Sequence, residues 1–192
     1  MANLAYSLIF IFGLAVGSFL NCVIYRMEKE ESFLKGRSYC PHCKHTLGWQ
    51  DLIPIFSFIG LRGKCRYCHQ RISFQYPIIE ISTGLIFLSI YNLQFTIFNL
   101  IIAPFLIIIF VYDLKHYIIP DRVIYPAIVI AGIYNLQFLI FNQFSIFKFS
   151  ILSARGAAGF FLAIVLVSRG KWMGVGDIKL AFLMGLFLGY PN

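Results

Sequence analysis

The chain has 192 residues, of which 59% are hydrophobic and 12% are charged, and its mean hydropathy is +0.79. A soluble domain is usually about half apolar and a quarter charged, so this composition excludes an ordinary soluble protein. Residues 4–25 and 81–112 carry no charge, and about 20 apolar residues suffice to cross a bilayer. The sequence therefore predicts an all-α polytopic membrane protein with about six transmembrane helices.

The first predicted span covers residues 4–25 and ends at Arg26. It lacks a basic n-region and an obvious small-x-small cleavage site, so we expect a retained helix. Small and amide residues on a membrane helix usually mark contacts between helices. We expect this role for Gly13 and Ser18, whereas Asn21, near the charged end, could serve a polar site.

Residues 26–75 form the substantial polar segment of the chain and contain nine of its 16 Lys and Arg residues. An excess of Lys and Arg near span ends marks the cytoplasmic side of a membrane. With the spans predicted here, only Lys148 and Arg155 fall on the outer side. The N-terminus is therefore expected outside and the polar segment inside. This orientation explains the net charge of +8 without a nucleic-acid partner.

Two Cys-x-x-Cys pairs, separated by 21 residues, lie in this polar segment: Cys40 with Cys43, and Cys65 with Cys68. Four thiolates close a tetrahedron around zinc and leave no position for water, so the predicted site is structural. Redox pairs or disulfides are the alternatives, and a cytoplasmic location disfavours lasting disulfides. The apolar residues 47–61 between the pairs should pack on the zinc loop or lie on the membrane surface.

Residues 76–112 are too long for one span, because a helix rises 1.5 Å per residue and the bilayer core is about 30 Å thick. Two short spans with a turn at residues 92–94 fit better, and they return the chain to the cytoplasm at Asp113. Glu80 lies about one turn into the first of them. It could pair with a basic group or line a polar cavity.

Asp113 closes an apolar run, and Pro120 then breaks any continuous helix. Asp121 follows where a helix cap belongs, so a cap, an ion pair with Arg122 and a chemical role are all open. The remaining spans are predicted at about 123–138, at 151–167 and from Ile178 onward, with an outer loop at 139–150.

The stretch Gly174-Val-Gly-Asp177 puts a carboxylate at the entrance of the last span. A carboxylate at membrane depth is costly and usually functional, and the glycines let another backbone come close. The alternative is a turn in which Asp177 caps a helix. Because Asp113 lies at the same predicted face, the pair suggests an aspartyl protease, in which two close carboxylates share a proton. Proton-coupled transport is the rival use of such acids.

Taken together, these features resemble the bacterial type IV prepilin peptidases, also called leader peptidase/N-methyltransferases. The resemblance runs in order over nearly the whole chain. Its matching stretches are Gly17-Ser-Phe-Leu-Asn-Cys-Val-Ile-Tyr-Arg26, the double Cys-x-x-Cys loop with Trp49, Leu52-Ile-Pro-Ile and Gly63-Lys-Cys, Tyr76-Pro-Ile-Ile-Glu80, Asp113 through Ile119-Pro-Asp121, and Gly174-x-Gly-Asp-Ile-Lys-Leu180. The chain departs from the family in having Met27-Glu28 where Leu-Pro is usual. Relatives usually carry one or two further spans.

The resemblance implies an aspartyl protease of the bacterial inner membrane that cuts the basic leader of prepilins and pseudopilins at the cytoplasmic face. Many such enzymes then methylate the new N-terminus with S-adenosylmethionine. By position, Asp113 and Asp177 match the catalytic aspartates, and the four cysteines match the metal-binding loop associated with methylation. The residues expected to support these sites are Asn21, Arg26, Glu80, Asp121, Gly174, Gly176 and Lys179.

The predicted organisation is a first transmembrane helix at 1–25, a zinc loop at 26–75 and a peptidase core at 76–192. The expected partners are prepilin substrates and the lipid bilayer. No Gly-rich fingerprint for S-adenosylmethionine is visible, so no residues are assigned to that cofactor. A peptidase without methylation, and a zinc-stabilised transporter or assembly adaptor, are the alternative functions.

Overall fold

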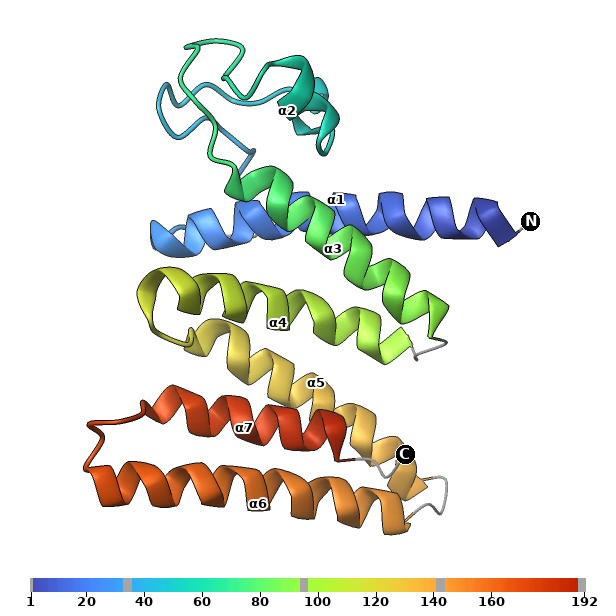
Figure 1. The fold of residues 1–192 in the computed structure, drawn as a ribbon, viewed down its shortest axis with the longest axis vertical. Coiled ribbons are helices and arrows are strands. Elements are labelled where there is room, and N and C mark those ends of the chain that lie inside the picture. Colours follow the sequence, from blue (N-terminus) through green and yellow to red (C-terminus); the bar gives the residue numbers. More distant parts are fainter. Residues whose placement is uncertain (1, 33–35, 94–96, 141–143, 190–192) are drawn as a thin grey trace. The chain divides into compact units, whose positions relative to one another are not determined.

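The computed structural model describes residues 2–32, 36–93, 97–140 and 144–189. Within these ranges the chain forms α-helices, one short 3-10 helix and two isolated β-bridges, without a strand (Figure 1). The prediction of an all-α protein is confirmed. The elements are α1 (Ala2–Glu28), η1 (Trp49–Leu52), α2 (Phe56–Gly60), α3 (Gln75–Asn92), α4 (Ile97–His116), α5 (Asp121–Ile140), α6 (Phe144–Ser168) and α7 (Val175–Leu188).

The chain divides into two compact units, Met1–Pro104 and Phe105–Asn192, and the division falls inside α4. The predicted division at residues 25 and 75 follows membrane topology instead and stays a prediction. Both predicted catalytic aspartates lie in the second unit, and the four cysteines of the two Cys-x-x-Cys pairs lie in the first.

In the first unit, α1 and α3 approach closely enough for their backbones to touch. A Cβ on Gly13 would lie 2.7 Å from the Gly84 Cα, and one on Gly17 would lie 2.7 Å from the Glu80 Cα. Small residues allow this close contact between membrane helices. The helix-contact role expected for Gly13 is therefore confirmed. α1 contains no proline and continues through Met27 to Glu28.

In the second unit, α7 packs against α5 and α6. A Cβ on Gly185 would overlap the backbone of Ala154 in α6. The buried Asn135 of α5 donates from its Nδ2 to the Leu186 carbonyl at 3.1 Å. These contacts fix the helix that begins with the Gly-x-Gly-Asp stretch.

The outer loop predicted at 139–150 is largely wrong, because α6 begins at Phe144. Residues 144–150 contain neither Pro nor Gly, and their one charge, Lys148, is a long side chain that can reach an interface. The helix therefore extends through them, and Arg155 lies three turns inside α6 rather than near its end. Residues 141–143 lie outside the described part of the chain.

Among the described residues, three helices are long and apolar enough to cross a membrane, namely Leu4–Glu28, Ile97–His116 and Phe144–Ser168. The other three predicted spans are also helical but are more polar or shorter. Glu80 lies within α3, α5 begins with Asp121-Arg122, and the 14 residues of α7 rise about 21 Å against a core of about 30 Å. The count of six spans therefore stays a prediction.

Candidate active site and metal centre

The carboxylate of Asp177 closes the first turn of α7. Its Oδ2 accepts a hydrogen bond from the Gly174 backbone N–H at 3.1 Å, and the Asp177 N–H donates to the Gly174 carbonyl at 3.2 Å. Such a carboxylate satisfies an N–H that would otherwise lack a partner at the helix start. The capping role considered for Asp177 from the sequence is thus present. It leaves the other carboxylate oxygen, Oδ1, for a second task.

The second glycine of this stretch packs against the connection between α4 and α5. A Cβ on Gly176 would lie 3.1 Å from the Cβ of the buried Ile119. The nearest atom to a Cβ on Gly174 would be the Asp177 Oδ2, at 3.8 Å, an ordinary contact distance. Gly176 is therefore the glycine that close packing requires.

Asp121 joins the start of α5 to the first turn of α7. The Lys179 Nζ donates to the Asp121 Oδ1 at 2.6 Å and lies 4.8 Å from the centre of the Tyr125 ring. The partner of Asp121 is thus Lys179, not the Arg122 considered from the sequence. The Asp121 side chain is 60% exposed, so the pair adds little stability. It nevertheless links these two helix ends.

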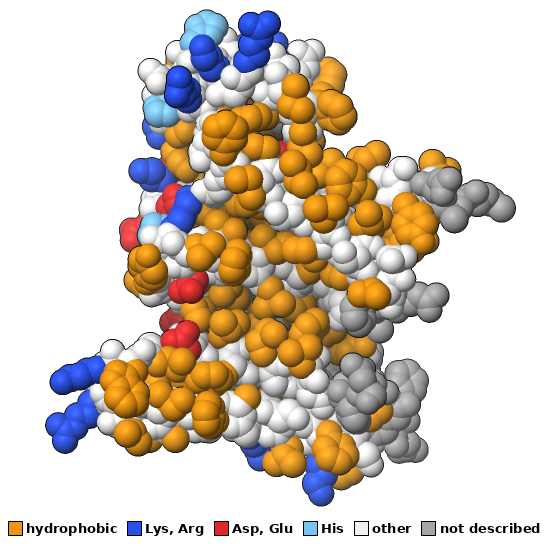
Figure 2. Space-filling model, viewed as in Figure 1, with side chains coloured by type: hydrophobic (Ala, Val, Ile, Leu, Met, Phe, Trp, Pro, Cys, Tyr) orange, Lys and Arg blue, Asp and Glu red, His pale blue; other side chains and the backbone are white. Residues whose placement is uncertain are grey.

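Asp113 lies exposed in the last turn of α4, and its carbonyl accepts from the Tyr117 N–H at 2.8 Å. The acids of residues 105–192 are Asp113, Asp121 and Asp177. All three lie at helix ends, which the Gly176–Ile119 and Lys179–Asp121 contacts hold at one edge of the unit. Figure 2 shows acidic side chains gathered at this edge. Among the described contacts, no hydrogen bond joins the carboxylates of Asp113 and Asp177.

The candidate metal centre is built from two copies of one ten-residue turn, 38–47 and 63–72. In the first, the Cys40 N–H donates to the His45 carbonyl at 2.9 Å, and an antiparallel bridge pairs Tyr39 with Thr46. In the second, Cys65 donates to Gln70 at 2.8 Å, and a bridge pairs Lys64 with Arg71. The residue after each Cys-x-x-Cys, Lys44 or His69, has a positive φ. Each turn thereby points two sulfurs in one direction.

The four Sγ atoms of Cys40, Cys43, Cys65 and Cys68 lie within 4.8 Å of one another, and the pair Cys40–Cys68 is 3.8 Å apart. A tetrahedron with Zn–S bonds of about 2.3 Å has sulfurs about 3.8 Å apart. The cluster therefore fits a zinc ion with four thiolate ligands. A zinc bound there would hold the two turns together and would leave no open position for catalysis.

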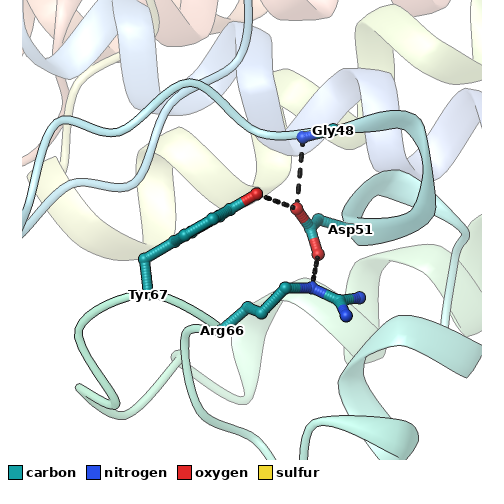
Figure 3. A network of polar contacts seen from close by, with 4 residues as sticks. All are labelled: Gly48, Asp51, Arg66 and Tyr67. Carbon is teal, nitrogen blue, oxygen red and sulfur yellow. Dashed lines mark hydrogen bonds and ion pairs between the residues drawn. The ribbon is translucent and has the colours of Figure 1, made fainter.

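A polar network centred on Asp51 anchors the segment between the two turns (Figure 3). One carboxylate oxygen accepts from the Arg66 Nε at 2.6 Å, and the other accepts from the Gly48 N–H at 3.1 Å and the Tyr67 hydroxyl at 3.4 Å. Burial raises the pKa of Asp51, but the hydrogen bonds from Arg66 and Gly48 outweigh it and hold that pKa below its ordinary value. Asp51 thus fixes η1 against the second turn.

Glu80 ties the same segment to α3. Its Oε2 accepts from the Ile55 N–H at 2.8 Å, and its carboxylate also bonds with Ser18. Its side chain is buried, and these described partners are not the basic group considered from the sequence, whereas the polar-cavity role stays a prediction. Glu80 holds the backbone at the start of α2.

Asn21 and Arg26 are also buried in the first unit. Asn21 donates from its Nδ2 to the Tyr76 carbonyl at 3.0 Å, which adds a polar contact between α1 and α3. Arg26 donates to the carbonyls of Ser32, Gly36 and Arg37 at 3.0–3.2 Å and so turns the chain after α1. Arg26 thus holds the start of the cysteine loop, and Asn21 holds the point where the chain returns into α3.

Two family models match consecutive parts of this chain. Residues 11–94 match the bacterial peptidase A24 N-terminal domain, and residues 100–192 match the type IV leader peptidase family. A prepilin leader peptidase/N-methyltransferase of Bacillus subtilis is 35% identical over 188 residues, which cover 95% of this chain and 73% of the relative. The chain belongs to the type IV leader peptidase family.

Two further relatives carry the name prepilin leader peptidase/N-methyltransferase. The relative from Vibrio cholerae is 34% identical, and the match covers 93% of this chain and 76% of the relative. The relative from Myxococcus xanthus is 35% identical, and the match covers 94% of this chain but 55% of the relative. No solved structure matched significantly. The two family models fall close to the two compact units of this chain.

Sequence reasoning missed two packing residues. Ile119 appeared only as part of a motif, although it is the side chain that fills the space left by Gly176. Asn135 had no assigned role, although its amide also donates to the Ala131 carbonyl at 2.8 Å and joins α5 to α7. An amide within an apolar run is the signal that could have singled out Asn135.

Proposed function

We propose that this chain is a membrane aspartyl endopeptidase that removes the basic leader of type IV prepilins or pseudopilins at the cytoplasmic face of the bacterial inner membrane. The names of its relatives support the substrate class. The observation that carries the proposal is the joining of three acid-bearing helix ends through Gly176–Ile119 and Asp121–Lys179. Asp113 and Asp177 are the two acids of that edge that hold no described ion pair.

In the proposed reaction, Asp113 and Asp177 act as a unit that shares one proton. The ionised carboxylate takes a proton from water, whose oxygen attacks the scissile carbonyl. The protonated carboxyl donates its proton to that carbonyl oxygen, which gives a tetrahedral intermediate. The carboxyl that took the proton from water then donates it to the leaving nitrogen as the C–N bond breaks, and the first carboxyl recovers its proton from the hydroxyl of the intermediate. No metal is needed at this step, and a four-cysteine zinc site would be structural.

The ends of the helices suggest which acid takes which role. Asp177 accepts a backbone N–H at the N-terminus of α7, where the helix dipole stabilises negative charge. Asp113 lies in the last turn of α4, where the dipole has the opposite sign. We therefore assign Asp177 as the base that activates water and Asp113 as the acid that protonates the substrate.

The predicted orientation supports access of the substrate. With six spans and the N-terminus outside, the ends that carry Asp113 and Asp177 would face the cytoplasm, together with all but two of the 16 Lys and Arg residues. A prepilin helix lying in the membrane would present its basic leader at the same face.

We further propose that cleavage is followed by methylation of the new N-terminal amine. The relatives' names support this second activity. S-adenosylmethionine would supply the methyl group when bound. The four cysteines would contribute by stabilising the loop, with zinc bound between the two turns.

The test is cleavage of a purified prepilin by the wild type, Asp113→Asn and Asp177→Asn in lipid. Asparagine keeps an acceptor oxygen for the Gly174 N–H, so Asp177→Asn separates the chemistry from the cap. Asp51→Asn is the matched control, because Asp51 makes the same 3.1 Å cap to a glycine three residues earlier. We expect losses of about 10²–10⁴-fold in both active-site variants and near wild-type cleavage in the control.

Cleavage by either active-site variant at the wild-type rate would rule out the two-aspartate mechanism. A wild type that cuts no prepilin would favour the transporter or adaptor class instead. Mass spectrometry of the product N-terminus after addition of S-adenosylmethionine reports methylation separately.

A further inference from the structure

The segment between the two cysteine turns carries an exposed hydrophobic patch, here called the 49–59 patch. It lies on η1, α2 and their junction, and its side chains are between 39% and 73% exposed. Its members are Trp49, Leu52, Ile53, Phe56 and Ile59. Exposed apolar clusters of this kind mark interaction sites, and this one lies in the most polar part of the chain.

The patch is held in its exposed position at both ends. At one end, the Asp51 network binds η1 to the second cysteine turn (Figure 3). At the other end, Glu80 of α3 holds the Ile55 N–H, and Ile55 adopts φ 62°, a conformation that β-branched residues rarely take. A strained backbone persists where its surroundings fix it. The exposure of the patch is therefore built into the fold.

Basic side chains accompany the patch. Arg62 and Lys64 follow α2 directly, and Lys64 is paired with Arg71 in the bridge of the second turn; all three are exposed. The sole acid between residues 36 and 74 is Asp51, which is already bonded to Arg66. Figure 2 shows basic side chains at the outer end of this loop and hydrophobic ones beside α2. The patch thus combines apolar and cationic groups.

The loop that carries the patch is tethered to the membrane. It leaves α1, a candidate span, and returns into α3, which packs on α1. Apolar side chains beside exposed cations match an interfacial segment, in which the apolar part enters the headgroup boundary. Tryptophan favours this depth, and Lys and Arg attract anionic headgroups. We propose that the 49–59 patch docks on the anionic surface of the bilayer that anchors the chain.

Charge argues against two other occupants. A basic prepilin leader would be repelled by Arg62, Lys64 and Arg71. A second copy would bring the same cations face to face, at a cost that rises as water is excluded. An anionic lipid surface complements both the charge and the hydrophobicity of the patch.

The experiment uses Trp49 as the depth probe in the full chain. The chain has two tryptophans, and Trp172→Phe leaves Trp49 as the reporter. Proteoliposomes with anionic lipids, and without prepilin, are prepared with lipids brominated on the acyl chains, and acrylamide is the aqueous quencher. We expect strong quenching of Trp49 by bromine and weak quenching by acrylamide. Bromine quenching should be largely lost in Phe56→Gln/Ile59→Gln, whose replaced side chains are exposed.

Charge variants test the anionic partner. Each Lys or Arg near a charged surface contributes about 1 kcal/mol, so Arg62→Gln and Lys64→Gln should each lower the docked-to-undocked ratio about fivefold. Lys148→Gln, on α6 of the other unit, is the matched control and should have no effect. Retained zinc content verifies that the loop is folded in every variant.

Two results would overturn docking on the membrane. Trp49 quenched by acrylamide and not by bromine would mean that the patch faces water. Trp49 shielded from both quenchers would mean that protein covers it, with a second copy as the occupant if dilution in lipid restores acrylamide quenching. Because the readout needs no cleavage, its outcome is independent of the proposed peptidase activity.

Discussion

Replacing Gly176 by alanine should impair catalysis by displacing Asp177. The added Cβ would lie 3.1 Å from the Ile119 Cβ, whereas carbon atoms prefer separations of about 3.5–4.0 Å. The turn or its neighbour must therefore move by about 0.4–0.9 Å. Ile119 is buried and contacts the new methyl through its own Cβ, so a change of rotamer cannot relieve the overlap. Such overpacking typically costs about 1–3 kcal/mol of stability.

The expected effect on activity follows from this displacement. Because a misplacement of about 1 Å can cost about 10²-fold, we expect kcat/KM for prepilin cleavage to fall between tenfold and a hundredfold. The assay is cleavage in lipid, with thermal unfolding measured on the same samples. Lowering the temperature should not restore activity, because the defect is in the folded state.

Two other glycines serve as matched controls for Gly176→Ala. Gly174 has φ −83° and ψ 160°, which alanine adopts, so Gly174→Ala should cost about 1 kcal/mol of cap stability and little activity. Gly132 lies in α5 with no atom near its missing Cβ, so Gly132→Ala should be neutral or slightly stabilising. Equal losses in Gly174→Ala and Gly176→Ala, or wild-type activity in Gly176→Ala, would refute the packing argument.

Three further predictions concern the polar contacts. The folded pKa of Asp51 is depressed, so its contribution to loop stability is fully present above its ordinary pKa of 3.8 and is lost as the pH falls through the lower folded value. The protease resistance of the loop should therefore fall in that acid range. The Asp51→Asn variant should already be less resistant at neutral pH and should show no such fall in acid. Removing zinc with a chelator should expose residues 38–72 to protease, whereas the helices of 105–192 should stay protected; equal cleavage of both regions would contradict a structural role confined to the loop. A double-mutant cycle on Lys179 and Asp121 should return less than about 1 kcal/mol of coupling in thermal unfolding, because the pair is exposed; a value above about 2 kcal/mol would show a buried pair.

The sequence was most informative where the chemistry is local. The two Cys-x-x-Cys pairs predicted a four-sulfur cluster, because each pair fixes its own turn and the spacing permits the two turns to meet. The helices were predictable from apolar runs, but their ends were not. Residues 144–150 were predicted as part of an outer loop with Lys148, yet an uninterrupted helix can carry a single lysine.

The partners of polar residues could not be predicted in the same way. Asp121 pairs with Lys179, 58 positions away, rather than with its neighbour Arg122, and Glu80 binds a backbone N–H 25 positions away. Both depend on tertiary packing that no local pattern encodes. The requirement for glycine at 176 was visible as a motif, whereas its physical cause, the side chain of Ile119, needed the structure.

The glycine contacts between α1 and α3 also bear on the order in which the first unit folds. These helices flank a loop of more than 40 residues, and bringing the ends of such a loop together costs about 3 kcal/mol of chain entropy. A free segment of this size seldom folds without a disulfide, a bound metal or a partner chain. Once Gly13 meets Gly84 and Gly17 meets Glu80, the two ends are already fixed, and that entropy no longer opposes assembly of the cysteine turns. Pairing of α1 and α3 in the bilayer should therefore precede binding of the metal. A larger side chain in place of Gly13 or Gly17 should weaken zinc binding at the cysteine turns, although neither glycine touches them.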